Sequence, residues 1–218
     1  MSSEYLLEVN NLKQYFPIRT GWFGTRPLKA VDDVSLDIYP GETLGLVGES
    51  GCGKSTLLNI IGGMDQMTSG EVLVEGRDMS NPTEDELTEY RREYVGFIFQ
   101  AYNLMPNLSA YENVEFIAEI SDNAMDSMEA LKLVGLEEKA NSMPSALSGG
   151  QMQRISIARA LVKNPKIILA DEPTGSVDRK TADYIYDLFV RLNQEKGQTI
   201  VIVTHDTTLA KKVKRVVA

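Results

Sequence analysis

The chain has 218 residues, of which 43% are hydrophobic and 24% charged, a composition typical of one globular domain with a buried core. A formal net charge of −9 argues against a broad nucleic-acid surface, so we expect no nucleic-acid partner. The single cysteine, Cys52, excludes an internal disulfide and a cysteine-rich metal site.

The first forty residues have strand-like patterns. Residues 6–9 and 30–38 carry them, and the sequence that joins the two contains glycine, proline and aromatic residues. Residues 39–42, Tyr-Pro-Gly-Glu, then have turn chemistry. We expect an antiparallel β portion ahead of the main core.

Three short runs, at residues 43–47, 167–170 and 200–203, are almost wholly apolar. Continuous apolarity indicates strands that are covered on both faces, as in a parallel sheet. Between the last two runs, apolar residues fall at the spacing of one helix face: Ile185, Leu188, Phe189 and Leu192. The sequence therefore predicts an α/β fold with a mainly parallel core sheet.

The middle of the chain has no strong strand signal. Residues 109–112 have the spacing of a capping box, as do residues 83–86 earlier, and Gly135 has the position of a helix stop. We predict one domain over residues 1–218, with a helical subdomain inserted at about residues 101–148.

A phosphate-binding loop follows the first apolar run. Residues 48–55 match G-x-x-x-x-G-K-[ST] between a predicted strand and a predicted helix, a context that disfavours a chance glycine-rich turn. Backbone N–H groups and the helix N-terminus would bind phosphate, Lys54 would neutralise the β- and γ-phosphates, and Ser55 would bind Mg²⁺. The predicted nucleotide-binding residues are Gly48, Glu49, Ser50, Gly51, Cys52, Gly53, Lys54, Ser55 and Thr56.

An acidic pair ends the apolar run at residues 167–170. Asp171 stands where α/β sheets place ligand-binding groups, and we predict that it holds Mg²⁺. Glu172 is suited to act as the general base that orients the attacking water. The alternative is a solvated acidic pair at the start of a loop. The preceding strand and the following Pro-Thr-Gly favour the functional interpretation.

Residues 147–154, Leu-Ser-Gly-Gly-Gln-Met-Gln-Arg, place a hydroxyl residue and two glycines at the start of a helix. Such a turn can bind an anion, or it can simply cap the helix. The string resembles the signature motif of ABC ATPases, and the resemblance extends over essentially the whole chain. It implies the P-loop NTPase fold of an ABC nucleotide-binding domain, which hydrolyses ATP to ADP and phosphate.

The resemblance also implies roles for single residues. Gln100 matches the Q-loop glutamine that contacts Mg²⁺ and the water, and His205 matches the switch histidine at the γ-phosphate. Asp178 matches the D-loop, although leucine is more usual where Val177 stands. Phe16, or its neighbour Tyr15, aligns with the aromatic residue that stacks on adenine. The implied catalytic residues are Lys54, Gln100, Glu172 and His205, and the implied metal ligands are Ser55, Gln100 and Asp171.

In this family two subunits enclose ATP head to tail. The resemblance therefore implies that a second nucleotide-binding subunit, identical or homologous, supplies Ser148, Gly149, Gly150, Gln151 and Asp178. It also implies a transmembrane permease. No signal peptide and no apolar run of the ~20 residues that span a bilayer is present. We expect a cytoplasmic protein, peripheral on the inner face of the cell membrane through the permease.

Two branches of the family share the resemblance. The part before Leu57 is similar to oligopeptide and dipeptide import ATPases. The part from Leu57 onward is similar to the lipoprotein-release, macrolide-export and antimicrobial-peptide-resistance ATPases. We hypothesise a mosaic, natural or engineered, joined near residues 56–57, with a lipoprotein/macrolide-type permease. The alternatives are an oligopeptide importer, an engineered domain without a transport role, and an ABC ATPase of DNA repair or translation.

The last residues include the basic run 211–215, which is predicted to be a solvated helix end. Family members usually continue past His205 with a strand and a turn containing Asp-Gly. The sequence here is shorter, which predicts a truncated or minimal domain.

Overall fold

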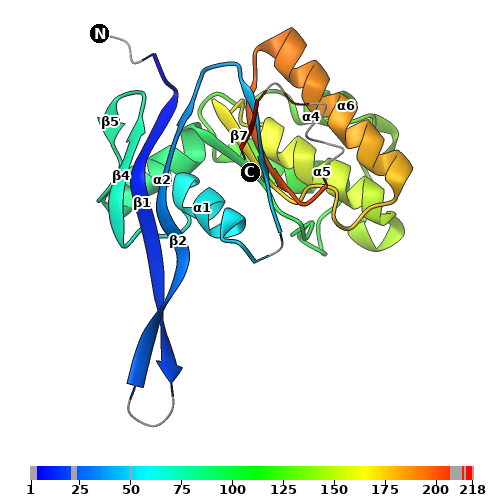
Figure 1. The fold of residues 1–218 in the computed structure, drawn as a ribbon. Helices are drawn as coiled ribbons and strands as arrows, with labels where there is room; N and C mark the ends of the chain where they lie inside the picture. Colours follow the sequence, from blue (N-terminus) through cyan, green and yellow to red (C-terminus); the bar gives the residue numbers. More distant parts are fainter. Residues whose placement is uncertain (1–3, 21–23, 50, 207–212, 214, 218) are drawn as a thin grey trace.

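The computed structural model describes residues 4–20, 24–49, 51–206, 213 and 215–217 (Figure 1). The strands are β1 Leu7–Thr20, β2 Gly24–Ile38, β3 Thr43–Val47, β4 Ser69–Val74, β5 Arg77–Asp78, β6 Val95–Ile98, β7 Ile167–Asp171, β8 Thr199–Thr204 and β9 Arg215–Val217. The helices are α1 Lys54–Ile61, α2 Glu84–Glu93, α3 Ala110–Glu119, α4 Ser127–Leu133, α5 Gly149–Leu161 and α6 Arg179–Lys196, with short 3-10 turns η1 Glu137–Lys139 and η2 Pro144–Ala146.

Within these residues, β6-β7-β8-β3-β9 form a parallel sheet in that order. The three predicted core strands are β3, β7 and β8, so the expected α/β fold is confirmed. Because side chains alternate across a strand, the sheet separates two apolar clusters. One contains Leu44, Leu46, Leu169, Val201 and Val203 with residues of α1. The other contains Ile168, Ala170, Ile200 and Ile202 with residues of α5 and α6.

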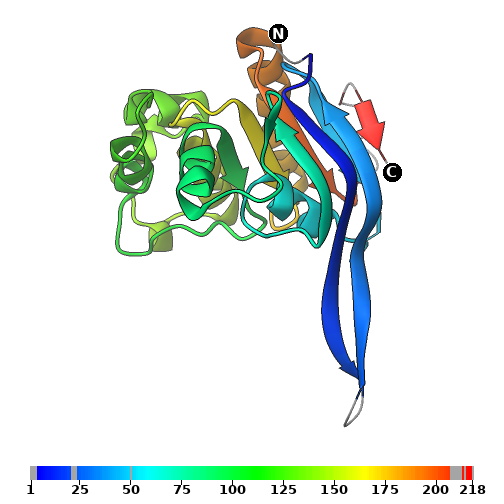
Figure 2. The same cartoon turned by 90° about the vertical axis from the view of Figure 1, so that its left-hand side faces the viewer.

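The antiparallel sheet has the order β2-β1-β4-β5, which confirms the expected β portion. Its first two strands form a hairpin that projects well beyond the rest of the molecule (Figures 1 and 2). They continue through the stretch that the sequence pattern predicts to be a connection. Pro17 and Pro27 lie directly opposite each other there. In an antiparallel pair, two opposite residues either exchange both backbone hydrogen bonds or exchange none. Two prolines that face each other therefore remove the hydrogen bonds of at most one residue pair.

The helices are fixed by the local signals that the sequence carries. Both expected capping boxes are present, at Thr83 with Glu86 and at Ser109 with Glu112. Helix α6 buries the predicted face, including Ile185 and Phe189. None of the described helices combines the length and apolar character that a membrane crossing needs.

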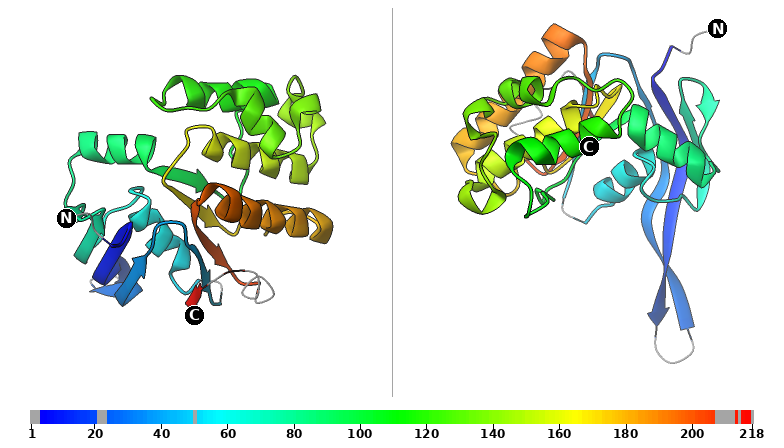
Figure 3. Two further views of the ribbon diagram at one scale, coloured as in Figure 1. Left: turned by 90° about the horizontal axis from the view of Figure 1, so that it is seen from above. Right: turned by 180° about the vertical axis from the view of Figure 1, so that it is seen from behind.

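Residues 101–148 contain α3, α4, η1 and η2 and no strand. Seen from above, these helices gather with α5 at one end of the molecule, opposite the antiparallel sheet (Figure 3). Val114 of α3 and Leu131 of α4 share one apolar cluster with Ile157 of α5 and Ile202 of the core sheet. The division of the chain into a core and an inserted helical subdomain stays a prediction.

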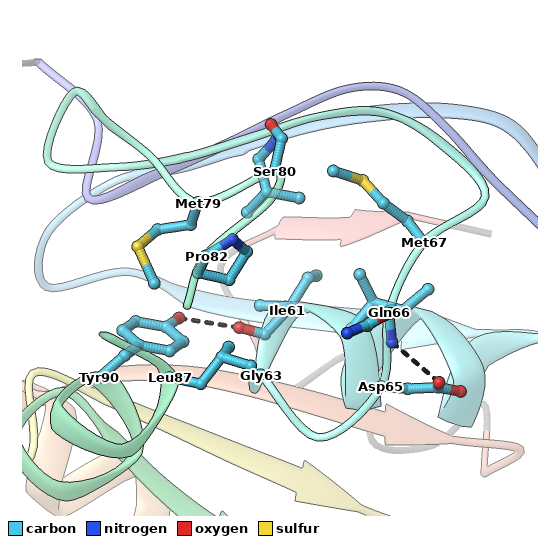
Figure 4. Close-up of a pocket in the computed structure, with 12 residues that line it drawn as sticks. Ile61, Gly63, Asp65, Gln66, Met67, Met79, Ser80, Pro82, Leu87 and Tyr90 are labelled. Carbon is cyan, nitrogen blue, oxygen red and sulfur yellow. Dashed lines mark hydrogen bonds between the residues drawn. The ribbon is translucent and has the colours of Figure 1, made fainter. Parts of the chain in front are cut away.

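A small cavity lies between α1, α2 and the loop before β4 (Figure 4). Its volume is about 30 Å³, roughly that of one water molecule, so it cannot hold a nucleotide. Tyr90 lines it, is 6% exposed and donates its hydroxyl to the Ile61 carbonyl at 2.8 Å.

The end of the described chain corrects one expectation. The sequence pattern predicts that Arg215 lies at a helix end, but it begins β9, which pairs with the edge of β3. Its guanidinium Nε lies 2.6 Å from Glu42 Oε1, so the strand is held by an ion pair as well as by backbone bonds. Lys211, Lys212 and Lys214 lie outside the described residues.

Candidate functional site

The phosphate loop connects the C-terminal end of β3 to α1, as predicted. Gly53 is the N-cap of α1 and has φ 89°, a conformation that L side chains rarely adopt. A Cβ at this position would lie 1.8 Å from the Ala30 carbonyl oxygen of β2. Glycine therefore allows the loop to pack against the hairpin. The predicted loop residue Ser50 lies outside the described residues.

The ammonium group of Lys54 lies inside the loop. It donates to the carbonyl oxygens of Gly48 and Glu49, each at 2.7 Å, and lies 3.4 Å from the Cys52 sulfur. The loop thus concentrates positive charge beside the N-terminus of α1, where backbone N–H groups have no partner within the helix. This arrangement is suited to bind the phosphates of a nucleotide.

Ser55, at the start of α1, and Asp171, at the end of β7, are in contact. The Ser55 hydroxyl donates to Asp171 Oδ1 at 2.9 Å, although the two residues are far apart in the sequence. Burial raises the pKa of the Asp171 carboxyl, and the hydrogen bond from Ser55 opposes that effect. A half-buried carboxylate beside a hydroxyl and a phosphate loop fits Mg²⁺, which uses one or two protein oxygens together with waters and phosphates.

Glu172 and His205 also come together. His205 Nδ1 lies 3.0 Å from Glu172 Oε1, and the glutamate side chain is 14% exposed against 60% for the histidine. The backbone of Glu172 has φ 46°, in the left-handed region, and its N–H donates to the Val203 carbonyl at 2.9 Å. A sharp turn at the end of β7 therefore directs the glutamate toward the end of β8.

A cavity of about 430 Å³ is lined by Lys54, Ser55 and Glu172, whereas their partners Asp171 and His205 do not line it. The predicted site residues that line it are Phe16, Gly51, Gly53, Lys54, Ser55, Thr56, Gln100 and Glu172. The Gln100 amide lies against Gly175, in the turn that begins at Glu172. The cavity thus brings together a phosphate loop, a carboxylate and an exposed aromatic ring.

Sequence reasoning missed part of the lining, namely Leu28, Lys29, Ala30 and Val203. Leu28 lies directly opposite Phe16 in the hairpin. The pairing of residues 15–20 with residues 24–29 would have revealed it, but register shifts after Val9, Leu12 and Gln14 hide that pairing in the sequence.

The signature residues lie elsewhere. Ser148 caps α5 through a capping box with Gln151, and Gly150 lies against Thr181 of α6. Asp178 is the N-cap of α6 and accepts from the Thr181 N–H at 3.0 Å. Among the described residues that line the cavity, none belongs to this group, which comprises Ser148, Gly149, Gly150, Gln151 and Asp178.

Fold and cavity together define an α/β protein of the phosphate-loop class. Residues 31–175 match the ABC transporter family. An uncharacterized ABC transporter ATP-binding protein, MJ0796 of Methanocaldococcus jannaschii, is 45% identical over 208 residues, 91% of this chain and 88% of the relative. The chain therefore belongs to the ABC transporter family, as an ATP-binding subunit with ATPase activity.

Solved structures agree with this assignment. The MJ0796 cassette bound to ADP and Pi, described as dimeric, has a TM-score of 0.86 at 42% identity, covering 97% of this chain and 93% of that one. The structure of cbiO1 from Clostridium perfringens, described as part of the ABC transporter complex cbiONQ, has a TM-score of 0.81 at 29% identity. It covers 98% of this chain and 84% of that one.

Proposed function

We propose that the chain hydrolyses ATP at the 430 Å³ cavity, with Glu172 as the base that orients water and His205 as its partner at the γ-phosphate. The 3.0 Å contact between these two side chains, beside the phosphate loop, is the observation that carries the proposal. Lys54 neutralises the phosphates, and Gln100 would contact Mg²⁺ and the attacking water. Ser55 and Asp171 would hold Mg²⁺, which would supply positive charge to offset the negative charge that develops on the phosphates.

Substitution of Glu172 tests the assigned base. Glu172→Gln keeps the size of the side chain and removes its ability to accept a proton, so turnover should fall by a factor on the order of 10² or more. Binding of ATP should persist, because the phosphate loop is untouched, and ATP should trap a dimer that size-exclusion chromatography detects. An unchanged hydrolysis rate would remove Glu172 from the mechanism.

We further propose that a second subunit completes the site. The signature group lies outside the cavity that holds Lys54 and Glu172, so within one chain Ser148 does not line the nucleotide site. The Ser148 end of α5 has the N–H groups of a helix N-terminus and is suited to bind the γ-phosphate of a neighbour's nucleotide. The dimeric MJ0796 cassette supports this arrangement.

Mixed dimers distinguish a shared site from a self-contained one. Lys54→Ala impairs the phosphate loop and Ser148→Arg impairs the signature, so each variant alone should be inactive. If sites are shared head to tail, a mixed dimer regains one intact site, formed by the loop of the Ser148→Arg chain and the signature of the Lys54→Ala chain. Recovery of ATPase activity on mixing is expected. Two folded but inactive variants without recovery would refute the shared site.

The proposed membrane partner is a lipoprotein/macrolide-type permease, which places the protein on the cytoplasmic face of the cell membrane. The helices expected to receive it expose apolar side chains: Phe116 is 47% exposed, Ile120 55% and Met128 40%. ATPase stimulation by each reconstituted permease type tests the choice. We expect stimulation by the four-helix type with a large extracytoplasmic domain. Stimulation only by an oligopeptide permease pair would favour the importer. Stimulation by neither permease type would favour a domain without a transport role.

The mosaic remains a hypothesis that rests on the change of resemblance near Thr56 and Leu57. It predicts that residues 1–56 and 57–218 align best with different branches. Equal similarity of both parts to one branch would contradict it. The acidic net charge of −9 disfavours a repair or translation ATPase, and a salt-dependent affinity for DNA or ribosomes would revive that alternative.

A further inference from the structure

A buried tyrosine of α6 contacts the turn that follows Glu172. Tyr186 is 4% exposed, and its hydroxyl oxygen lies 2.5 Å from the hydroxyl oxygen of Thr174. The side chain of Thr204, which is 1% exposed, lies close enough to interact with the Tyr186 hydroxyl. Burial raises the pKa of Tyr186, so the phenol stays neutral. Three hydroxyl groups, from the β7 turn, from α6 and from the end of β8, thus form one buried network.

On one side, this network reaches the turn that carries the proposed base. Thr174 is two residues after Glu172, and the Gly175 N–H closes the turn by donating to the Glu172 carbonyl at 3.0 Å. The left-handed backbone of Glu172, φ 46°, is disfavoured for a residue other than glycine. Such a conformation persists only where surrounding contacts hold it. The bond between Thr174 and Tyr186 is one of those contacts.

On the other side, the network reaches the residue that precedes His205. The Thr204 hydroxyl accepts from the Asp206 N–H at 3.1 Å and interacts with the Tyr186 hydroxyl, so it connects Tyr186 to the backbone on both sides of the histidine. The β7 turn and the β8 end are then joined twice, through the backbone bond from Glu172 to Val203 and through the side-chain network.

We propose that Tyr186 is a positioning residue for ATP hydrolysis: its hydroxyl couples the turn that carries Glu172 to the strand end that carries His205 and thereby maintains their 3.0 Å contact. The proposal rests on the function proposed for those two residues. Tyr186 does not line the nucleotide cavity, so it should affect the rate of the chemical step rather than ATP binding. Displacement of a reacting group by about 1 Å can lower a rate by up to about 10²-fold.

The test is Tyr186→Phe in the full chain, which keeps the ring and removes the hydroxyl. We expect kcat to fall by a factor on the order of ten, while KM for ATP stays within about twofold. Tyr90→Phe is the matched control. It also removes a buried tyrosine hydroxyl, which donates to the Ile61 carbonyl, but Tyr90 does not line the nucleotide cavity (Figure 4). Tyr90→Phe should therefore lower Tm without lowering kcat.

Thr174 gives a second test. Thr174→Val should reproduce the loss of kcat, and Thr174→Ser, which keeps the hydroxyl, should restore it. The double variant Tyr186→Phe with Thr174→Val should be no slower than Tyr186→Phe alone, because Tyr186→Phe already removes the bond to Thr174.

The Glu172→Gln background separates the two proposals. If Tyr186 acts through Glu172, Tyr186→Phe should not lower the residual rate of Glu172→Gln further. If Glu172→Gln itself leaves turnover unchanged, the proposed function fails. If Glu172→Gln abolishes turnover while folded Tyr186→Phe and Thr174→Val keep kcat within twofold of the unchanged chain, only the role of Tyr186 is overturned.

Discussion

Substitution of Gly53 by alanine should displace the phosphate loop. The new Cβ would lie 1.8 Å from the Ala30 carbonyl oxygen and 2.9 Å from the Ala30 carbonyl carbon, so the loop or β2 must move by more than 1 Å. The positive φ of 89° adds roughly 1–2 kcal/mol of strain, and forced overpacking roughly 1–3 kcal/mol. Together they predict a loss of roughly 2–5 kcal/mol, unless the loop relaxes by giving up its contact with the hairpin.

Gly51→Ala is the matched control, because Gly51 has φ 83° but no heavy atom within 4 Å of the position that a Cβ would take. It carries only the conformational strain. At about 2–4 °C per kcal/mol for a domain of this size, Gly53→Ala should melt several degrees below Gly51→Ala in a thermal unfolding experiment. Isothermal titration should show ATP affinity reduced most in Gly53→Ala. Equal melting temperatures and equal affinities for the two variants would show that the close approach of Gly53 to Ala30 does not constrain the loop.

Two further predictions concern single side chains. Burial lowers the pKa of Lys163 to about 8, while its ammonium donates to the Arg91 carbonyl at 2.6 Å. The buried ammonium therefore destabilises the folded state below pH 8, and this destabilisation disappears as the pH rises from 8 to 10.5. Across that range the unfolding free energy of the unchanged chain should rise, relative to that of Lys163→Met, by an amount on the order of 1–3 kcal/mol. Urea unfolding at several pH values measures this, and a constant difference would contradict it. Cys52 is exposed within the loop, so a bulky maleimide should block ATP binding, and ATP should slow the modification. Full binding after complete modification would argue against the loop assignment.

The core could be predicted because its signals are local. Continuous apolar runs marked β3, β7 and β8, and the capping boxes at Thr83 and Ser109 needed only residues three positions apart. The phosphate loop was equally local. These features depend on residues that are close together in the chain, so their spacing can be seen directly in the sequence.

The remaining features depend on contacts between distant segments. The hairpin register places Leu28 opposite Phe16. It depends on shifts in strand pairing between Val9 and Tyr15, which the alternation of apolar and polar residues does not reveal. The place of Tyr186 could not be read either, because an aromatic residue next to Ile185 on α6 looks like ordinary core. Only the fold brings its hydroxyl to Thr174.

The projecting hairpin divides the nucleotide cavity into two mechanically different halves. The phosphate half is built on β3, β7 and α1, within the apolar clusters, whereas Phe16 and Leu28 are 36% and 50% exposed on two strands that leave the body (Figure 2). A hairpin without a packed third strand has little stability of its own. The triphosphate should therefore dominate nucleotide affinity, and discrimination among bases should be modest, so GTP should compete with ATP far better than AMP does.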